Sequence, residues 1–134
     1  MVTYFEMVRE FHEAAKLPIA DAPCWAVDSH YLRLNLHREE MAEIEDAFER
    51  KDMVALADGL ADLIYVLCGT AVTFGIPLDA VFEEVHRSNM TKTIEPRWRE
   101  DGKLIKGPHY EPPSLAPILA WRATESVTEG ENDD

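Results

Sequence analysis

The chain has 134 residues, of which 46% are hydrophobic and 29% charged, and this size and composition fit one globular domain. Its formal net charge of −13 argues against a nucleic-acid-binding surface, because phosphate backbones attract an excess of Lys and Arg. Two cysteines form no disulfide framework and the N-terminal segment does not resemble a signal peptide, so a cytoplasmic location is expected.

Four segments have the spacing of apolar residues that is typical of helices. They cover about residues 2–16, 28–50, 53–74 and 77–89. A loop that contains Trp25 separates the first two, and Asp28 or Ser29 is a suitable N-cap for the second helix. Gly75 is expected to end the third helix in a left-handed conformation. The sequence therefore predicts an all-α fold, an antiparallel four-helix bundle.

The chain changes character after Thr93. Residues 97–106 hold Asp101-Gly102 between two short mixed segments, which predicts a tight turn or a small hairpin. Four prolines over residues 108–117 then predict a C-terminal extended arm, and the acidic residues 124–134 are expected to be disordered. We expect one domain over residues 1–123, followed by this tail.

An uncharged apolar run over residues 63–78 raises the alternative of a membrane span. The run is too short to cross a bilayer comfortably, and Gly69, Gly75 and Pro77 interrupt it. A helix buried in a bundle or in a dimer core explains the run equally well, so no membrane partner is expected.

Acidic residues recur at helical spacing on the second and third predicted helices: Glu39, Glu40, Glu43, Asp58 and Asp62. A solvated acidic face is the commoner explanation for such glutamates. Asp62 argues against it, because apolar residues surround it and the third helix contains no Lys or Arg. A buried carboxylate must be protonated, paired with a cation or bound to a metal.

Carboxylates from two facing helices make an oxygen-rich pocket that suits Mg²⁺ or Mn²⁺. The absence of a His or Cys cluster argues against zinc. Salt bridges from the glutamates to Arg33 or Arg38 are the alternative. His37 shares a helical stripe with apolar residues, so we interpret it as a packed core histidine.

Residues 38–43 (REEMAE) and 57–65 (ADGLADLIY) resemble the MazG-like all-α NTP pyrophosphatase superfamily. The superfamily includes MazG, the phosphoribosyl-ATP pyrophosphohydrolases and the dimeric dUTPases. Its pattern is an ExxE pair followed by an ExxD pair. Glu40 and Glu43 match the first pair and Asp62 matches the last aspartate, but Gly59 replaces the other glutamate, with Asp58 as its apparent substitute. The run 85–92 (VHRSNMTK) resembles small single-domain members.

The resemblance implies a hydrolase that converts a nucleoside triphosphate to the monophosphate and pyrophosphate, with Mg²⁺ as cofactor and Mn²⁺ able to substitute. The expected metal ligands are Glu39, Glu40, Glu43, Asp58 and Asp62, with Glu40 first and Glu39 second as the residue that activates water. The favoured substrate is dUTP or a non-standard deoxynucleotide, in a house-cleaning role.

The triphosphate also needs cationic groups, and residues 87–106 hold six Lys and Arg against three acidic residues. The substrate-binding candidates are Asn89, Lys92, Lys106, Tyr110 and Trp25. Trp25 is expected either to stack on the base or to cap the core.

Two alternatives stay open: a phosphoribosyl-ATP pyrophosphohydrolase, and a non-catalytic helical dimerisation or adaptor module. The resemblance implies a homodimer or a dimer of dimers.

Overall fold

The computed structural model describes residues 1–120, and their contacts divide the chain into two compact units. The first unit covers Met1–Leu78, and the second begins at Asp79. The described residues are mostly helical and contain only a two-stranded sheet, which confirms the predicted all-α class. The predicted domain end at residue 123 and the predicted tail over 124–134 lie outside the described residues.

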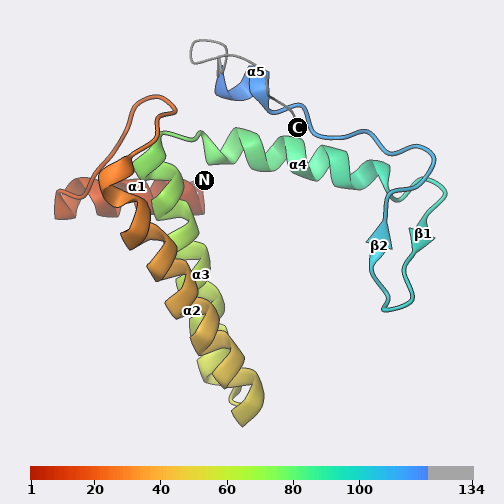
Figure 1. The fold of residues 1–134 in the computed structure, drawn as a ribbon, viewed down its shortest axis with the longest axis horizontal. Coiled ribbons are helices and arrows are strands. Elements are labelled where there is room, and N and C mark those ends of the chain that lie inside the picture. Colours follow the sequence, from red (N-terminus) through yellow and green to blue (C-terminus); the bar gives the residue numbers. More distant parts are fainter. Residues whose placement is uncertain (121–134) are drawn as a thin grey trace. The chain divides into compact units, whose positions relative to one another are not determined.

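The first unit contains three long helices and one short 3₁₀ helix (Figure 1). They are α1 (Tyr4–Ala15), η1 (Val27–Ser29), α2 (His30–Arg50) and α3 (Met53–Phe74). A turn at Lys51 and Asp52 reverses the chain, so α2 and α3 form an antiparallel hairpin, and α1 packs against α3. Three of the four predicted bundle helices therefore belong to this unit. The prediction that α4 joins them in a bundle stays a prediction.

Local capping residues set the ends of these helices. Thr3 caps α1 by accepting a hydrogen bond from the backbone N–H of Glu6 at 3.0 Å, and the Glu6 carboxylate accepts one from the backbone N–H of Thr3 at 2.9 Å. The Asp52 side chain accepts a hydrogen bond from the backbone N–H of Ala55 at 3.0 Å and so starts α3. Gly75 ends α3 with a φ of 71°, as predicted.

One stripe of α2 faces α3 along the whole hairpin, and it consists of residues at helical spacing: Arg33, His37, Glu40, Ile44 and Ala47. Arg33 and His37 contact Thr70 on α3, and Ile44 lies against Gly59. Of the apolar residues at helical spacing from His37, Ile44 is buried, but Met41 and Phe48 are exposed, so the predicted apolar stripe is only partly buried. His37 is partly buried through polar contacts with α3 instead.

The core of the first unit lies where α1 meets α3, around Val8, Cys68 and Val72. The loop between α1 and η1 is fixed to the end of α3 by two backbone hydrogen bonds. Ala20 N–H donates to the carbonyl of Val72, and Cys24 N–H donates to the carbonyl of Phe74, both at 3.0 Å. The loop that carries Trp25 therefore has a defined position next to the end of α3.

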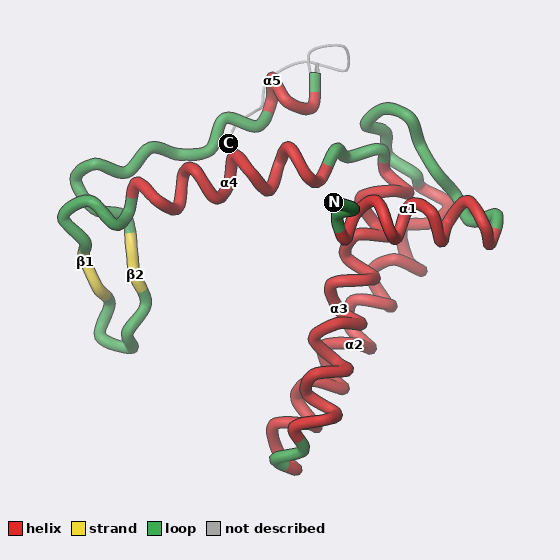
Figure 2. The backbone as a smooth tube through the Cα atoms, turned by 180° about the vertical axis from the view of Figure 1, so that it is seen from behind, coloured by secondary structure: helices red, strands yellow, loops and turns green. Residues whose placement is uncertain are grey.

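The second unit holds nearly all of α4 (Leu78–Thr91), the strands β1 (Arg97–Trp98) and β2 (Leu104–Ile105), and the short helix α5 (Ala116–Leu119). The strands pair antiparallel, with Trp98 opposite Leu104, and this confirms the predicted hairpin (Figure 2). The extended arm is also present after β2, but α5 at its end was not predicted.

The arm is attached to α4 by a network of polar contacts. Arg87 pairs with Glu84 at 2.9 Å and with Glu111 at 2.8 Å. Glu84 also accepts a hydrogen bond from the backbone N–H of Ser114 at 2.8 Å. The side-chain hydrogen bonds from Arg87, with the Ser114 N–H, lower the pKa of Glu84 to about 2. The Glu84 carboxylate therefore stays charged over the physiological pH range.

Among the described helices, α3 is long and apolar enough to cross a membrane by length and composition alone. The core helix of a soluble protein passes the same test, so the observation is weak. Here α3 packs against both α1 and α2, and it carries Asp58 and Asp62 within its span. These features agree with the interpretation of the apolar run as a packed helix.

Candidate metal centre

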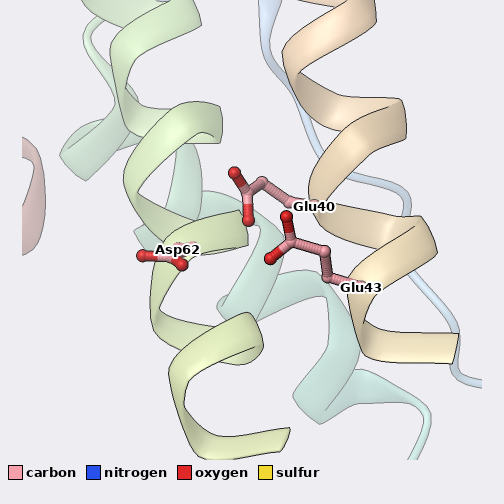
Figure 3. Close-up of side chains that lie close together, drawn as sticks. All are labelled: Glu40, Glu43 and Asp62. Carbon is pink, nitrogen blue, oxygen red and sulfur yellow. The ribbon is translucent and has the colours of Figure 1, made fainter. Parts of the chain in front are cut away.

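Three of the predicted ligands come together between α2 and α3. Each of Glu40, Glu43 and Asp62 offers a carboxylate oxygen, and these oxygens lie within 4.8 Å of one another. Figure 3 shows Glu40 and Glu43 extending from α2 toward α3, the helix that carries Asp62. Glu40 and Glu43 are three residues apart, which places both on one side of α2. The hairpin therefore gathers carboxylates that are about twenty residues apart in the sequence.

Glu40 carries a buried carboxylate oxygen. This oxygen, Oε1, has no hydrogen-bond partner among residues 1–120. Burial raises the pKa of the Glu40 carboxyl, and the negative charges of Glu43 and Asp62, followed by those of Glu39 and Asp58, raise it further. A buried acceptor atom surrounded by negative charge is unfavourable without a cation or a proton.

The alternative that these glutamates serve in salt bridges is not supported within residues 1–120. None of the trio forms an ion pair there. Arg33 instead donates from Nε to the Thr70 hydroxyl at 3.0 Å and from its terminal nitrogen to the carbonyl of Val66 at 2.6 Å. Arg38 forms no ion pair with a described residue either.

Glu39 and Asp58 lie outside the group of three. Both side chains are exposed, although their charges act on the pKa of Glu40, so they are in its neighbourhood. Gly59 is buried, and a Cβ there would lie 2.9 Å from Cγ1 of Ile44. A glutamate at this position, where the family pattern has one, would require Ile44 to shift. That Asp58 takes over as ligand stays a prediction.

Replacing Glu40 by glutamine is expected to stabilise the metal-free protein at pH 7. The folded pKa of Glu40 is above its ordinary value of 4.5, so the folded state binds the proton more tightly and loses stability as pH rises through that range. Glutamine removes this cost. Thermal unfolding in metal-free buffer at pH 4 and pH 7 measures the effect, with Glu45→Gln on the same helix as the exposed control. A Glu40→Gln protein that unfolds at a lower temperature than wild type at pH 7 would contradict the electrostatic account.

The predicted substrate-binding residues fall into both units. In the second unit, the side-chain nitrogens of Lys92 and Lys106 lie 5.9 and 5.2 Å from the ring centre of Tyr110. Asn89 is exposed on α4, one turn before Lys92. In the first unit, the Trp25 ring packs edge-on against Phe74 at 6.0 Å and is 71% exposed. Trp25 therefore covers the end of α3 and keeps most of its surface open.

The sequence did not predict the polar contacts that Arg33 and His37 of α2 make with α3. Arg33 is 9% exposed, and burial lowers its pKa, although a guanidinium remains charged. Burial, and then the charge of Arg33, also lower the pKa of His37, whose Nε2 lies 2.7 Å from the Thr70 hydroxyl. The small residues Gly69 and Thr70 on an apolar helix were the available signal, because they leave room for an arginine from α2.

Comparison with known proteins finds a matching family and a relative. The family model described as "Phosphoribosyl-ATP pyrophosphohydrolase" matches residues 8–89, which include the trio. An uncharacterized protein, L479 of Acanthamoeba polyphaga mimivirus, is 40% identical over 48 residues. The alignment covers 36% of this chain and 19% of the viral protein, so the chain spans only a small part of that relative.

Proposed function

Because the chain belongs to the phosphoribosyl-ATP pyrophosphohydrolase family, part of the MazG-like all-α superfamily, we propose that it is a divalent-metal-dependent hydrolase that cleaves a nucleoside triphosphate between the α- and β-phosphates. The products are the nucleoside monophosphate and pyrophosphate. The family supports pyrophosphohydrolase activity on acid anhydrides. The observation that carries the metal dependence is the trio of Glu40, Glu43 and Asp62, with its buried unpartnered oxygen.

The trio fits a hard divalent cation. All its donors are carboxylate oxygens, which Mg²⁺ and Mn²⁺ prefer, and a cation would satisfy the Oε1 atom of Glu40. Glu43 and Asp62 would hold the ion together with Glu40, and Asp58 and Glu39 are proposed as further ligands. A bound divalent ion supplies charge neutralisation at the phosphate oxygens and lowers the pKa of bound water.

Glu40 is our first choice for the residue that takes a proton from the attacking water, with Glu39 second. Burial first, and then the neighbouring carboxylates, raise the pKa of the Glu40 carboxyl above its ordinary value, which makes this carboxylate a stronger base. Glu39 is exposed and lies outside the trio, so its carboxylate is less constrained. The structure therefore supports this order of the two candidates.

Two substrates are candidates, and a different observation favours each. The resemblance within the superfamily favours dUTP or a non-standard deoxynucleoside triphosphate. The description of the matching family favours phosphoribosyl-ATP instead. The open face of Trp25 is available for stacking on a base, but stacking alone discriminates poorly between bases.

Values of kcat/KM for phosphoribosyl-ATP, dUTP and the four common dNTPs, measured by pyrophosphate release with Mg²⁺ and with Mn²⁺, test the proposal. We expect one class to exceed the others by about 100-fold or more, because a size difference in an apolar pocket already gives about 10- to 200-fold discrimination and buried polar contacts give more. Zero turnover of every compound would contradict the proposal and favour the helical adaptor module instead.

We also propose a homodimer or a dimer of dimers. Large apolar side chains on α3 are exposed in the single chain, including Leu60 at 49%, Ile64 at 43% and Leu67 at 44%. Ile64 also lines an apolar pocket of about 210 Å³ between α1 and α3, with Tyr4, Met7, Val8, Ala61 and Tyr65. An apolar surface of this kind is typical of subunit interfaces. Sedimentation equilibrium measures the stoichiometry.

A further inference from the structure

Two lysines in the second unit share one aromatic ring. Lys92 directly follows α4, and Lys106 directly follows β2. Their ammonium groups lie 5.9 and 5.2 Å from the centre of the Tyr110 ring. Two like charges on one ring repel each other, so the ring alone does not explain why both are gathered there.

Backbone contacts hold Tyr110 in this position. The N–H of the next residue, Glu111, donates to the Thr91 hydroxyl at 2.9 Å, and the Glu111 carbonyl accepts from the Ser88 hydroxyl at 2.7 Å. Tyr110 N–H itself donates to the carbonyl of Gly107 at 3.2 Å, which closes a tight turn after Lys106. Hydrogen bonds thus fix the backbone of the arm at Tyr110 and at Glu111, beside the end of α4. The ring that both lysines approach therefore has a defined position.

The nearby carboxylates have other partners. Glu111 pairs with Arg87 at 2.8 Å, and Glu95 pairs with His109. Lys92 and Lys106 form no ion pair with any residue of the described part. Within residues 1–120 of a chain with a net charge of −13, two ammonium groups near one ring are therefore kept without an anionic partner.

We propose that Lys92, Lys106 and Tyr110 form a binding site for a polyphosphate anion, the chemical class of a triphosphate tail and of pyrophosphate. Each ammonium group binds phosphate oxygens as a point charge, and the Tyr110 hydroxyl is a further donor. Two positive charges that lie 5.9 and 5.2 Å from one ring centre favour a chain of phosphates over a single phosphate or a carboxylate. Anion binding stands on these contacts alone, and its link to catalysis rests on the proposed function.

Isothermal titration of the full chain with inorganic tripolyphosphate, pyrophosphate and phosphate tests the site in buffer freed of divalent metals by a chelating resin. We expect tripolyphosphate and pyrophosphate to bind more tightly than phosphate. Lys106→Gln and Lys92→Gln should each weaken pyrophosphate binding about tenfold or more, because each removes a charge-assisted contact. Lys103→Gln is the matched control, since Lys103 is exposed on the same hairpin and lies on no ring.

Absence of pyrophosphate binding by the wild-type chain would overturn the inference. So would an equal loss of binding in Lys103→Gln, because that result indicates a general effect of charge. The two proposals fail separately. Pyrophosphate binding without turnover of any nucleotide removes the proposed function and leaves this site, whereas turnover with an unchanged KM in Lys106→Gln removes this site from catalysis.

Discussion

Replacing Asp62 by asparagine is expected to lower kcat/KM for the preferred nucleotide by about 100- to 1000-fold. Loss of a metal-holding carboxylate removes several kcal/mol of transition-state stabilisation, and each 1.4 kcal/mol corresponds to about a factor of ten in rate. Asparagine keeps the shape of the side chain, so packing against α2 should be preserved. The measurement is steady-state pyrophosphate release at saturating Mg²⁺.

Thermal unfolding of the same variant separates metal binding from catalysis. Mg²⁺ at about 100 times its dissociation constant should stabilise the wild-type protein by about 2.7 kcal/mol, and Asp62→Asn should lose most of this effect. Asp58→Asn is the matched control, because Asp58 is exposed and lies outside the group of three oxygens. Asp58→Asn should lower kcat/KM and the stabilisation by Mg²⁺ less than Asp62→Asn does. Wild-type activity and wild-type Mg²⁺ stabilisation in Asp62→Asn would remove Asp62 from the centre.

Replacing Gly75 by alanine is expected to destabilise the first unit by about 3 kcal/mol. Gly75 has a φ of 71°, a conformation that costs other residues about 1 kcal/mol or more. In addition, a Cβ at Gly75 would overlap the backbone carbonyl of Ala22, which a rigid loop cannot avoid cheaply. Overpacking of this kind typically costs about 1–3 kcal/mol. Urea unfolding followed by circular dichroism measures the loss.

Gly102→Ala separates the two contributions to this loss. Gly102 also has a positive φ, of 91°, but a Cβ there would have no neighbour within 4 Å. It should therefore lose only the conformational part, about 1 kcal/mol. Equal losses in the two variants would contradict this account, because they would show that the loop carrying Ala22 moves aside without a cost in stability.

The elements of the fold follow from the sequence where local rules decide them. The predicted range of α3, about residues 53–74, agrees with the structure, and the predicted stop signal Gly75 ends the helix. The short elements η1 and α5 were missed, since three or four residues carry no detectable periodicity. The second helix also begins two residues later than predicted, at His30, because η1 takes its first turn.

The candidate site could be predicted only in part. Glu43 and Asp62 followed from their spacing and from the apolar surroundings of Asp62 on α3. The sequence did not show that Glu39 and Asp58 lie outside the trio, because that depends on the rotation of α2 against α3. The same rotation turns Arg33 inward, although an arginine next to apolar residues is usually predicted to lie at the surface. Tertiary packing, not helical spacing, decides these positions.

Product analysis of a single reaction with Mg²⁺ tests the central claim most directly. Phosphorus NMR of the preferred nucleoside triphosphate should show equal amounts of nucleoside monophosphate and pyrophosphate, and removal of the metal should stop both from forming. Formation of inorganic phosphate and nucleoside diphosphate would contradict cleavage between the α- and β-phosphates. Turnover that continues unchanged without divalent metal would contradict the role of Glu40, Glu43 and Asp62.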